Sequence, residues 1–133
     1  MVTRARRQSA ALSRGLRERG ALPIELPTIE LRNPADFGPL DQAVRELECY
    51  DWVLFTSANG VERFWERMAA LGRDTRALRG RVCAIGPATA EALARHGVRA
   101  DRVAAEYRAE GVLQALAGED LAGRRVLIPR AAV

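Results

Sequence analysis

The chain has 133 residues, 48% of them hydrophobic, which predicts one domain of ordinary size, or one domain with part of another, around a substantial core. Basic residues number 21 against 17 acidic ones, a net charge of +4, and because the sequence contains no lysine all 21 are arginines. Guanidinium groups bind carboxylates and phosphates, but the excess is small and aromatic residues are only 5%, which argues against a nucleic-acid-binding protein.

The first predicted element is a helix over residues 3–20, with Gly20 as its C-terminal stop. In an α/β protein such a helix normally follows a strand, and only two residues precede it, so we expect the chain to be truncated. A short strand is predicted at 22–26, an extended segment at 28–31 and a turn-rich passage at 33–39, which together suggest a crossing between compact units. A helix follows over 40–48.

An unbroken apolar run begins at Trp52 and ends at Phe55, which predicts a strand covered on both faces and therefore a parallel sheet. A polar turn and a second helix follow. The apolar positions of this helix have helical spacing, and Gly72 ends it; they are Val61, Phe64, Trp65, Met68 and Leu71.

The same strand–turn–helix unit recurs along the rest of the chain. After a short turn or helical piece at 74–78, we predict a strand at 81–85, a turn at 86–89 and a helix at 90–96 closed by Gly97. A strand at 102–105, a turn at 106–111, a helix at 112–116 and a strand at 124–129 complete the pattern. This alternation predicts a three-layer α/β/α fold with right-handed crossovers, for which we expect a flavodoxin-like strand order.

Three turns would gather at the carboxyl ends of these strands, namely 56–60, 86–89 and 107–111. Each opens a helix, so unpaired backbone N–H groups and the positive end of the helix dipole would favour an anion there. The alternative is that these turns only cap their helices, because capping residues occur at most helix starts. The sequence leaves both interpretations open.

Other kinds of site find little support. The chain has neither a G-x-G-x-x-G motif nor a P-loop, so a nucleotide cofactor is not indicated. His96, the only histidine, falls in a last helical turn, where a structural role is expected. Ser57 lacks the G-x-S-x-G elbow, and Glu62 and Glu66 are expected on a solvated helix face.

Cysteine usage and hydropathy also exclude several classes. Cys49 and Cys83 form no metal or redox motif, and Cys83 is expected to be a small buried side chain. No stretch reaches the roughly 20 apolar residues of a membrane span, and the arginine-rich start lacks the apolar part of a secretory signal. We therefore expect no metal, no membrane and a reduced, cytoplasmic setting.

Several short segments, in this order and spacing, resemble the uroporphyrinogen-III synthase family. They are VTRA at 2–5, LPTIE at 26–30, FTSANGV at 55–61, IGPATA at 85–90, YRAEG at 107–111 and RVLIPRA at 125–131. The resemblance implies two α/β/α domains joined by a two-stranded linker, and a cofactor-free enzyme of tetrapyrrole biosynthesis. Hydroxymethylbilane would bind in the cleft and cyclise to uroporphyrinogen III with inversion of ring D, largely by being held in one conformation.

The resemblance also implies domain limits and roles. Residues 1–30 would be a fragment of the first domain, 31–125 a complete second domain and 126–133 a return linker. Thr89 is the candidate catalytic hydroxyl. The candidate substrate contacts are Arg4, Thr56, Ser57, Ala58, Asn59, Gly86, Pro87, Ala88, Tyr107 and Arg130.

The chain departs from the family in extent, because the first strand is nearly absent and the sequence ends where the family returns to its first domain. The alternative function is therefore a non-catalytic module or remnant that binds an anionic ligand. A receiver-like signalling domain is disfavoured, since it needs an acidic cluster where Thr56, Ser57 and Gly86 stand. The family resemblance implies a monomer, with self-association expected only for a truncated chain.

Overall fold

The computed structural model describes residues 14–22, 36–106 and 109–130, within two compact units, Met1–Ala35 and Asp36–Val133. In the first unit residues 14–17 are helical. The stop predicted at Gly20 is confirmed, because its φ is 81° and the N–H of Ala21 donates to the Leu16 carbonyl over 3.0 Å. Residues 3–13 of the predicted first helix, residues 23–26 of the first predicted strand and the segment at 28–31 lie outside the described residues.

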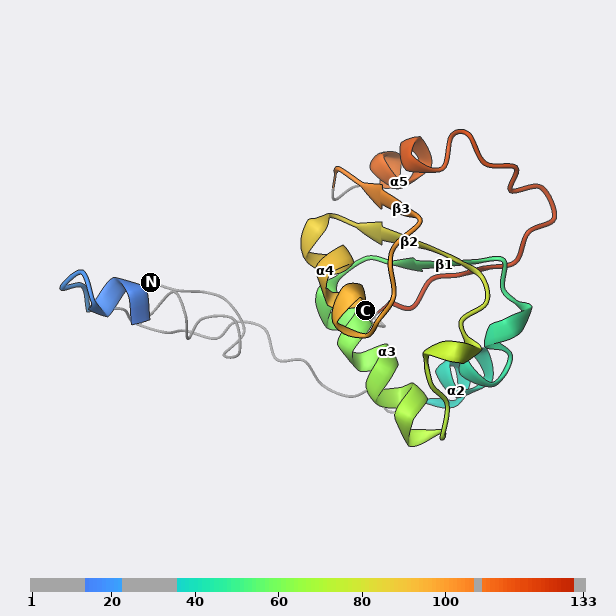
Figure 1. Cartoon of the computed structure of the whole chain (residues 1–133), viewed down its shortest axis with the longest axis horizontal. Coiled ribbons are helices and arrows are strands. Elements are labelled where there is room, and N and C mark those ends of the chain that lie inside the picture. The colour runs from blue at the N-terminus through green and yellow to red at the C-terminus, as the bar shows by residue number, and fades with distance from the viewer. Residues whose placement is uncertain (1–13, 23–35, 107–108, 131–133) are drawn as a thin grey trace. The chain divides into compact units, whose positions relative to one another are not determined.

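The second unit is a sheet with helices on both faces (Figure 1). Its strands are β1 (Trp52–Phe55), β2 (Arg81–Ile85), β3 (Arg102–Ala104) and β4 (Val126–Leu127). Its helices are α2 (Gly38–Arg45), α3 (Ala58–Ala70), α4 (Pro87–Arg95) and α5 (Ala109–Ala115), with short 3₁₀ helices η1 (Leu47–Cys49) and η2 (Thr75–Ala77).

The described strands pair in the order β3-β2-β1-β4, and every pairing is parallel. The α/β class and the parallel sheet are thus confirmed. The order differs from the flavodoxin order that we expected, in which the first strand lies between the second and third. Here β1 lies between β2 and β4, because α3 and α4 carry the chain outward to β3 and α5 then returns it past β1.

The unbroken apolar run of β1 is buried on both faces, as predicted. Val53 and Phe55 point toward α3 and α4, where most of the core lies, while Trp52 and Leu54 point toward α5. Phe55 packs edge-on against Phe64 of α3, with ring centroids 5.3 Å apart. The sheet therefore has a thick apolar layer on the α3 and α4 side and a thin one on the α5 side.

Several predicted boundaries are wrong by a few residues. The helix predicted at 40–48 is α2 followed by η1, while α3, α4 and α5 each begin three residues earlier than expected. α2 also begins two residues early, and the starts of α2 and α4 contain Pro39 and Pro87. A proline fits the first helical turn because its missing N–H is not needed there. The ends predicted at Gly72 and Gly97 are confirmed, and both residues have a positive φ.

Asp51, just before β1, holds β4 in the sheet. Its carboxylate accepts the backbone N–H of Arg125 over 2.9 Å and the Nη1 of Arg124 over 3.0 Å. Its own N–H donates to the Arg125 carbonyl over 2.9 Å. These hydrogen bonds, led by the one from the Arg125 N–H, hold the pKa of the Asp51 carboxyl below its usual value.

Other arginines at this amino-terminal end of the strands also form ion pairs within the protein. Arg81 and Arg102 both form ion pairs with Glu119, and the Arg81 guanidinium lies 4.5 Å from the centre of the Trp52 ring. Part of the arginine excess is thus used to stabilise the fold. No helix in the described part of the chain is long and apolar enough to cross a membrane.

We expect Asp51→Ala to lower the free energy of unfolding at neutral pH, because β4 loses its side-chain contacts to β1. A carboxyl whose pKa is lowered by folding stabilises the protein above its unfolded pKa of about 4, and this stabilisation is lost as the pH falls through the folded value. The gap between wild type and Asp51→Ala should therefore narrow on acidification. Urea unfolding at several pH values measures this gap.

Asp120→Asn is the matched control, because the Asp120 carboxylate bonds only to the nearby Ala122 N–H among the described residues. A gap for Asp51→Ala that stays constant with pH would contradict the role assigned to its charge.

Candidate anion-binding site

The strand order reverses between β1 and β4. From β1 the chain adds β2 and β3 on one side, and it then returns to add β4 on the other side. In open parallel sheets, ligands bind outside the carboxyl ends of the strands at such a point. The described residues that follow these strand ends form the carboxyl-end rim, defined as residues 56–60, 86–89 and 129–130. A Cβ added to Gly60 would lie 3.8 Å from the Pro129 carbonyl oxygen, so the segments after β1 and β4 are in contact.

The first turn of the rim is capped from within the protein. Ser57 has extended backbone, and its Oγ accepts the N–H of Gly60 over 3.0 Å. Because α3 begins at Ala58, Asn59 and Gly60 belong to its first helical turn and not to the preceding loop. Thr56 and Ser57 are exposed, and the N–H groups of Ala58 and Asn59 have no partner within the helix.

The second turn has no such cap. Gly86 has φ 78° and ψ 162°, a backbone conformation that is essentially limited to glycine, and its N–H donates to the Ala104 carbonyl over 2.9 Å. Among the described residues no side chain caps α4 at this point. Pro87 has no N–H, so the first donors that α4 offers to a ligand are the amides of Ala88 and Thr89.

The candidate catalytic hydroxyl is not on an open surface. Thr89 is only 1% exposed, whereas its neighbours Pro87 and Ala88 are exposed. The sequence left open whether these turns only cap their helices or also bind an anion. The first turn is capped by a side chain and the second is not, so the two turns fit different interpretations. Ser57 fits the structural role, and the start of α4 fits an anion site.

The structure brings some predicted contacts together and leaves others out. Residues 56–59 and 86–88 lie at the ends of the neighbouring strands β1 and β2. Arg130 comes directly after Pro129, which contacts Gly60. Its side chain is exposed and forms no ion pair with the other described residues. Arg4 and Tyr107 lie outside the described residues. Sequence reasoning did not single out Pro129, because its proximity depends on a strand order that no local pattern encodes.

His96, Glu62 and Cys83, which the sequence did not favour as site residues, make contacts that stabilise the fold. His96 stacks on Trp65 with centroids 4.8 Å apart, and its Nε2 lies 3.0 Å from a Glu62 carboxylate oxygen. Glu62 also accepts from Arg95, which with His96 lowers the pKa of its carboxyl. Glu62 thus links α3 to α4 and is less free than we expected. Cys83 is 1% exposed, as predicted, and burial raises the pKa of its thiol.

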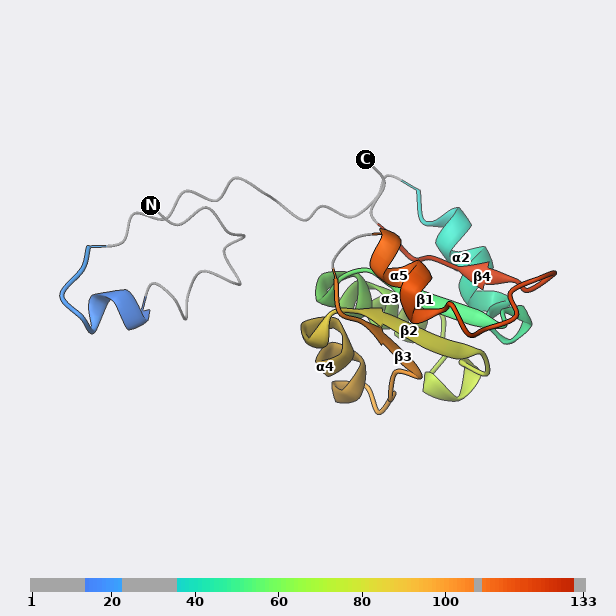
Figure 2. The same cartoon turned by 90° about the horizontal axis from the view of Figure 1, so that it is seen from above.

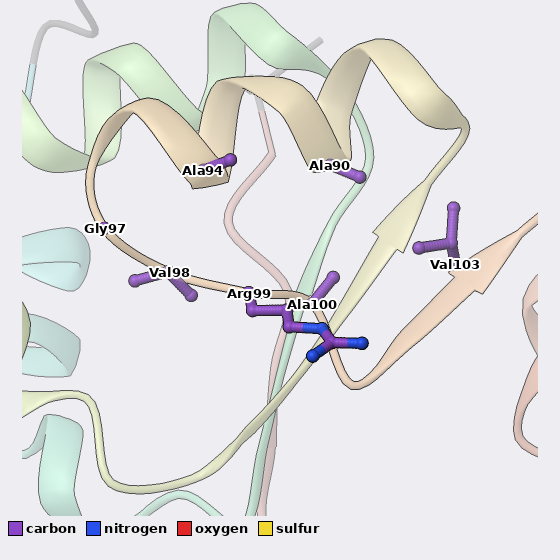
Figure 3. A pocket seen from close by; sticks show the side chains of 7 residues that line it. All are labelled: Ala90, Ala94, Gly97, Val98, Arg99, Ala100 and Val103. Carbon is purple, nitrogen blue, oxygen red and sulfur yellow. The ribbon is translucent and has the colours of Figure 1, made fainter.

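A cavity of about 590 Å³ lies beside the rim and not in it (Figure 3). It is formed by α4, the loop after it and the edge strand β3, and none of the predicted substrate contacts lines it. Its lining is mostly small and apolar, which does not suit a polycarboxylate ligand. The rim is therefore the better candidate site. The residues that line the cavity are Ala90, Ala94, Gly97, Val98, Arg99, Ala100 and Val103.

We expect Gly86→Ala to lower the free energy of unfolding by about 1–3 kcal/mol, because a Cβ is strained in this conformation. Gly118→Ala is the control, since a Cβ there meets no atom within 4 Å, and its effect should stay within about 0.5 kcal/mol. Urea unfolding of both variants measures the difference. Equal stabilities would show that Gly86 is not required by the backbone.

Comparison with known proteins places these features in context. Residues 10–133 match the family model described as HEM4, uroporphyrinogen-III synthase HemD. The uroporphyrinogen-III synthase of Synechococcus elongatus is 35% identical over 130 residues, which cover 98% of this chain and 49% of the relative. A putative uroporphyrinogen-III synthase of Methanothermobacter thermautotrophicus is 34% identical over 129 residues, with coverages of 97% and 50%. The chain spans about half the length of these curated relatives.

Solved structures show the same fold. The crystal structure of wild-type uroporphyrinogen III synthase from Thermus thermophilus aligns with a TM-score of 0.55 at 20% identity, covering 97% of this chain and 50% of that one. A mutant of the same enzyme gives 0.56 at 24% identity, with coverages of 83% and 42%. At these identities the likeness concerns the fold alone.

Proposed function

Because the chain belongs to the uroporphyrinogen-III synthase family, we propose that its carboxyl-end rim binds hydroxymethylbilane and takes part in its cyclisation to uroporphyrinogen III. The observation that carries this proposal is the uncapped start of α4. It lies beside the capped start of α3, close to the point where the strand order reverses. Both helices direct backbone donors to one edge of the sheet, which suits a ligand with several carboxylates.

The chemistry asked of these residues is mainly positioning. The linear tetrapyrrole must lose its terminal hydroxyl as water, which leaves an electrophilic azafulvene at that end. The far pyrrole attacks this end through its own substituted carbon, and the resulting spiro intermediate breaks its old bond and recloses with that ring inverted. The amides of Ala88 and Thr89 would hold one carboxylate, the start of α3 another, and Arg130 a third. Holding a flexible polyanion in one conformation lowers the entropic cost of ring closure and favours the inverted isomer.

The proposal includes Thr89 as the hydroxyl that assists loss of the leaving group. Its place in the first turn of α4 supports this role, although its burial requires the substrate to reach a covered side chain. The same burial makes Thr89→Ala a poor test, because that change would leave a cavity. Thr89→Val keeps the shape and removes only the hydroxyl. We also propose a cytoplasmic setting, which the two free cysteines, Cys49 and Cys83, support.

The direct test is to incubate the chain with hydroxymethylbilane and to separate the type I and type III products. We expect a type III fraction above that of the spontaneous reaction, and about a tenfold or greater loss of type III formation in Thr89→Val, as for other groups that assist proton transfer. Thr89→Ser, which keeps the hydroxyl, should retain most of the rate.

A product ratio equal to the spontaneous one would contradict catalysis by this chain. It would favour the alternative function, a non-catalytic module that binds an anionic ligand. Normal type III formation by Thr89→Val would contradict only the role of the hydroxyl.

Binding is tested separately by titrating a stable linear tetrapyrrole with several carboxylates. Arg130→Gln should weaken its affinity about three- to tenfold, as expected for loss of one charged contact. Arg79→Gln is matched in charge and exposure, and its side chain lies before β2, at the opposite end of the sheet. This control should bind like the wild type. An equal loss in both variants would show that only net charge matters.

A further inference from the structure

The cavity beside the rim lies where α4 faces the edge strand β3. β3 and β4 are at opposite edges of the sheet (Figure 2). Val103 of β3 pairs with Ala84 and therefore shares its face, yet Ala84 is 0% exposed and Val103 is 47% exposed. The side chains that α4 brings to the cavity are only those of Ala90 and Ala94. Their methyl groups do not fill the space over Val103, which leaves the cavity of about 590 Å³.

The lining of the cavity contains one charged side chain, that of Arg99. Every other lining residue is alanine, valine or glycine. Figure 3 shows Arg99 and Val103 on one side of the cavity, with Ala90 and Ala94 of α4 on the other. The cavity thus combines apolar walls with a single cation.

The charge of Arg99 is not neutralised within the described part of the chain. Its side chain is exposed and forms no ion pair with the other described residues. Two arginines near it in the sequence differ in this respect. Arg95 forms an ion pair with Glu62 of α3, over 2.9 Å. Arg102 forms one with Glu119, over 2.7 Å. The guanidinium of Arg99 can therefore bind an anion without breaking a pair that holds the fold.

Size and lining together indicate the chemistry of a ligand. Sites for small molecules are typically clefts of about 300–1,000 Å³ with mostly apolar walls and a few polar groups that fix orientation. Burial of an apolar body against such walls is favourable, and a guanidinium binds a carboxylate through two parallel hydrogen bonds. A ligand with several carboxylates would place charges against apolar walls without partners. One cation therefore suits a ligand with one anionic group.

We propose that the cavity between α4 and β3 is a second binding site, which takes a small monoanion with an apolar body. Its carboxylate pairs with Arg99, and its body covers Val103. The rim lies at the start of α4 and this cavity along its side, so the two sites are distinct. The inference goes beyond the proposed function and does not depend on it, because it requires neither a tetrapyrrole nor catalysis.

The experiment titrates the whole chain with naphthoate and with decanoate, an apolar ring and an apolar chain that each carry one carboxylate. Backbone amide shifts in NMR spectra report the binding. For at least one of them we expect saturable binding with a Kd below about 1 mM, with the largest shifts at residues 97–100 and small ones at 56–60 and 129–130. The tighter of the two shows whether the preferred body is a ring or a chain. Naphthylmethanol, which lacks the charge, should bind about tenfold more weakly than naphthoate.

Two pairs of variants locate the site. Arg99→Gln should weaken binding about tenfold, because the charged contact is lost. Arg79→Gln removes the same charge from an exposed side chain that does not line this cavity, and it should bind like the wild type. Ala94→Leu should prevent binding by filling the cavity. Ala69→Leu makes the same change at an exposed position of α3 and should have no effect. Circular dichroism checks that each variant keeps the fold.

Absence of saturable binding by both compounds, or equal weakening in Arg99→Gln and Arg79→Gln, would overturn the proposal. Shifts centred on 56–60 and 129–130, with binding weakened by Arg130→Gln, would also overturn it, because the compounds would then occupy the rim. A dimer in light scattering that Ala94→Leu dissociates would do so in favour of a second copy as the occupant. None of these results bears on the product ratio from hydroxymethylbilane, so this proposal and the proposed function fail separately.

Discussion

The carboxylate of Asp51 binds a backbone N–H and a guanidinium of two successive residues, Arg125 and Arg124, and the first of these is 74 positions away. Besides this pairing, β4 is held by a two-residue ladder with β1, by backbone hydrogen bonds to the Arg125 carbonyl and by the packing of Leu127 on the core. The position of β4 brings Pro129 to the start of α3. It also causes the reversal of strand order at which the rim lies. A group at the amino-terminal end of the sheet thus determines which residues meet at the other end.

The two ends of the sheet use similar residues in different ways. At the amino-terminal end, Arg81, Arg102 and Arg124 are neutralised by acidic partners and fix strand positions. At the carboxyl end, the positive potential comes from helix starts and from Arg130, which has no acidic partner among the described residues. The net charge of +4 therefore does not show this contrast between the two ends of the sheet.

Local patterns in the sequence predicted the parts of the fold that local physics determines. The apolar run at β1, the glycine stops at Gly72 and Gly97, and the bounds of β2 follow from burial and backbone conformation alone. The strand order did not follow, because it depends on a contact between Asp51 and the segment before β4 that leaves no mark at either site. The burial of Thr89, the candidate catalytic hydroxyl, did not follow either, since the spacing that places it in the first turn of α4 does not reveal which side of that turn the core covers.

The unequal layers of the sheet also bear on how the protein moves. α2, α3 and α4 share one continuous core with the inner strands, whereas α5 rests on a small cluster of Trp52, Leu54, Cys83 and Leu116. Regions with few buried contacts open at lower free energy than the global unfolding reaction. Amide hydrogens of α5 should therefore exchange with solvent through local opening, while those of β1 and β2 exchange only when the whole unit unfolds. The cooperative unit is the half of the sheet that packs against α3 and α4, and the α5 half is the part that opens first.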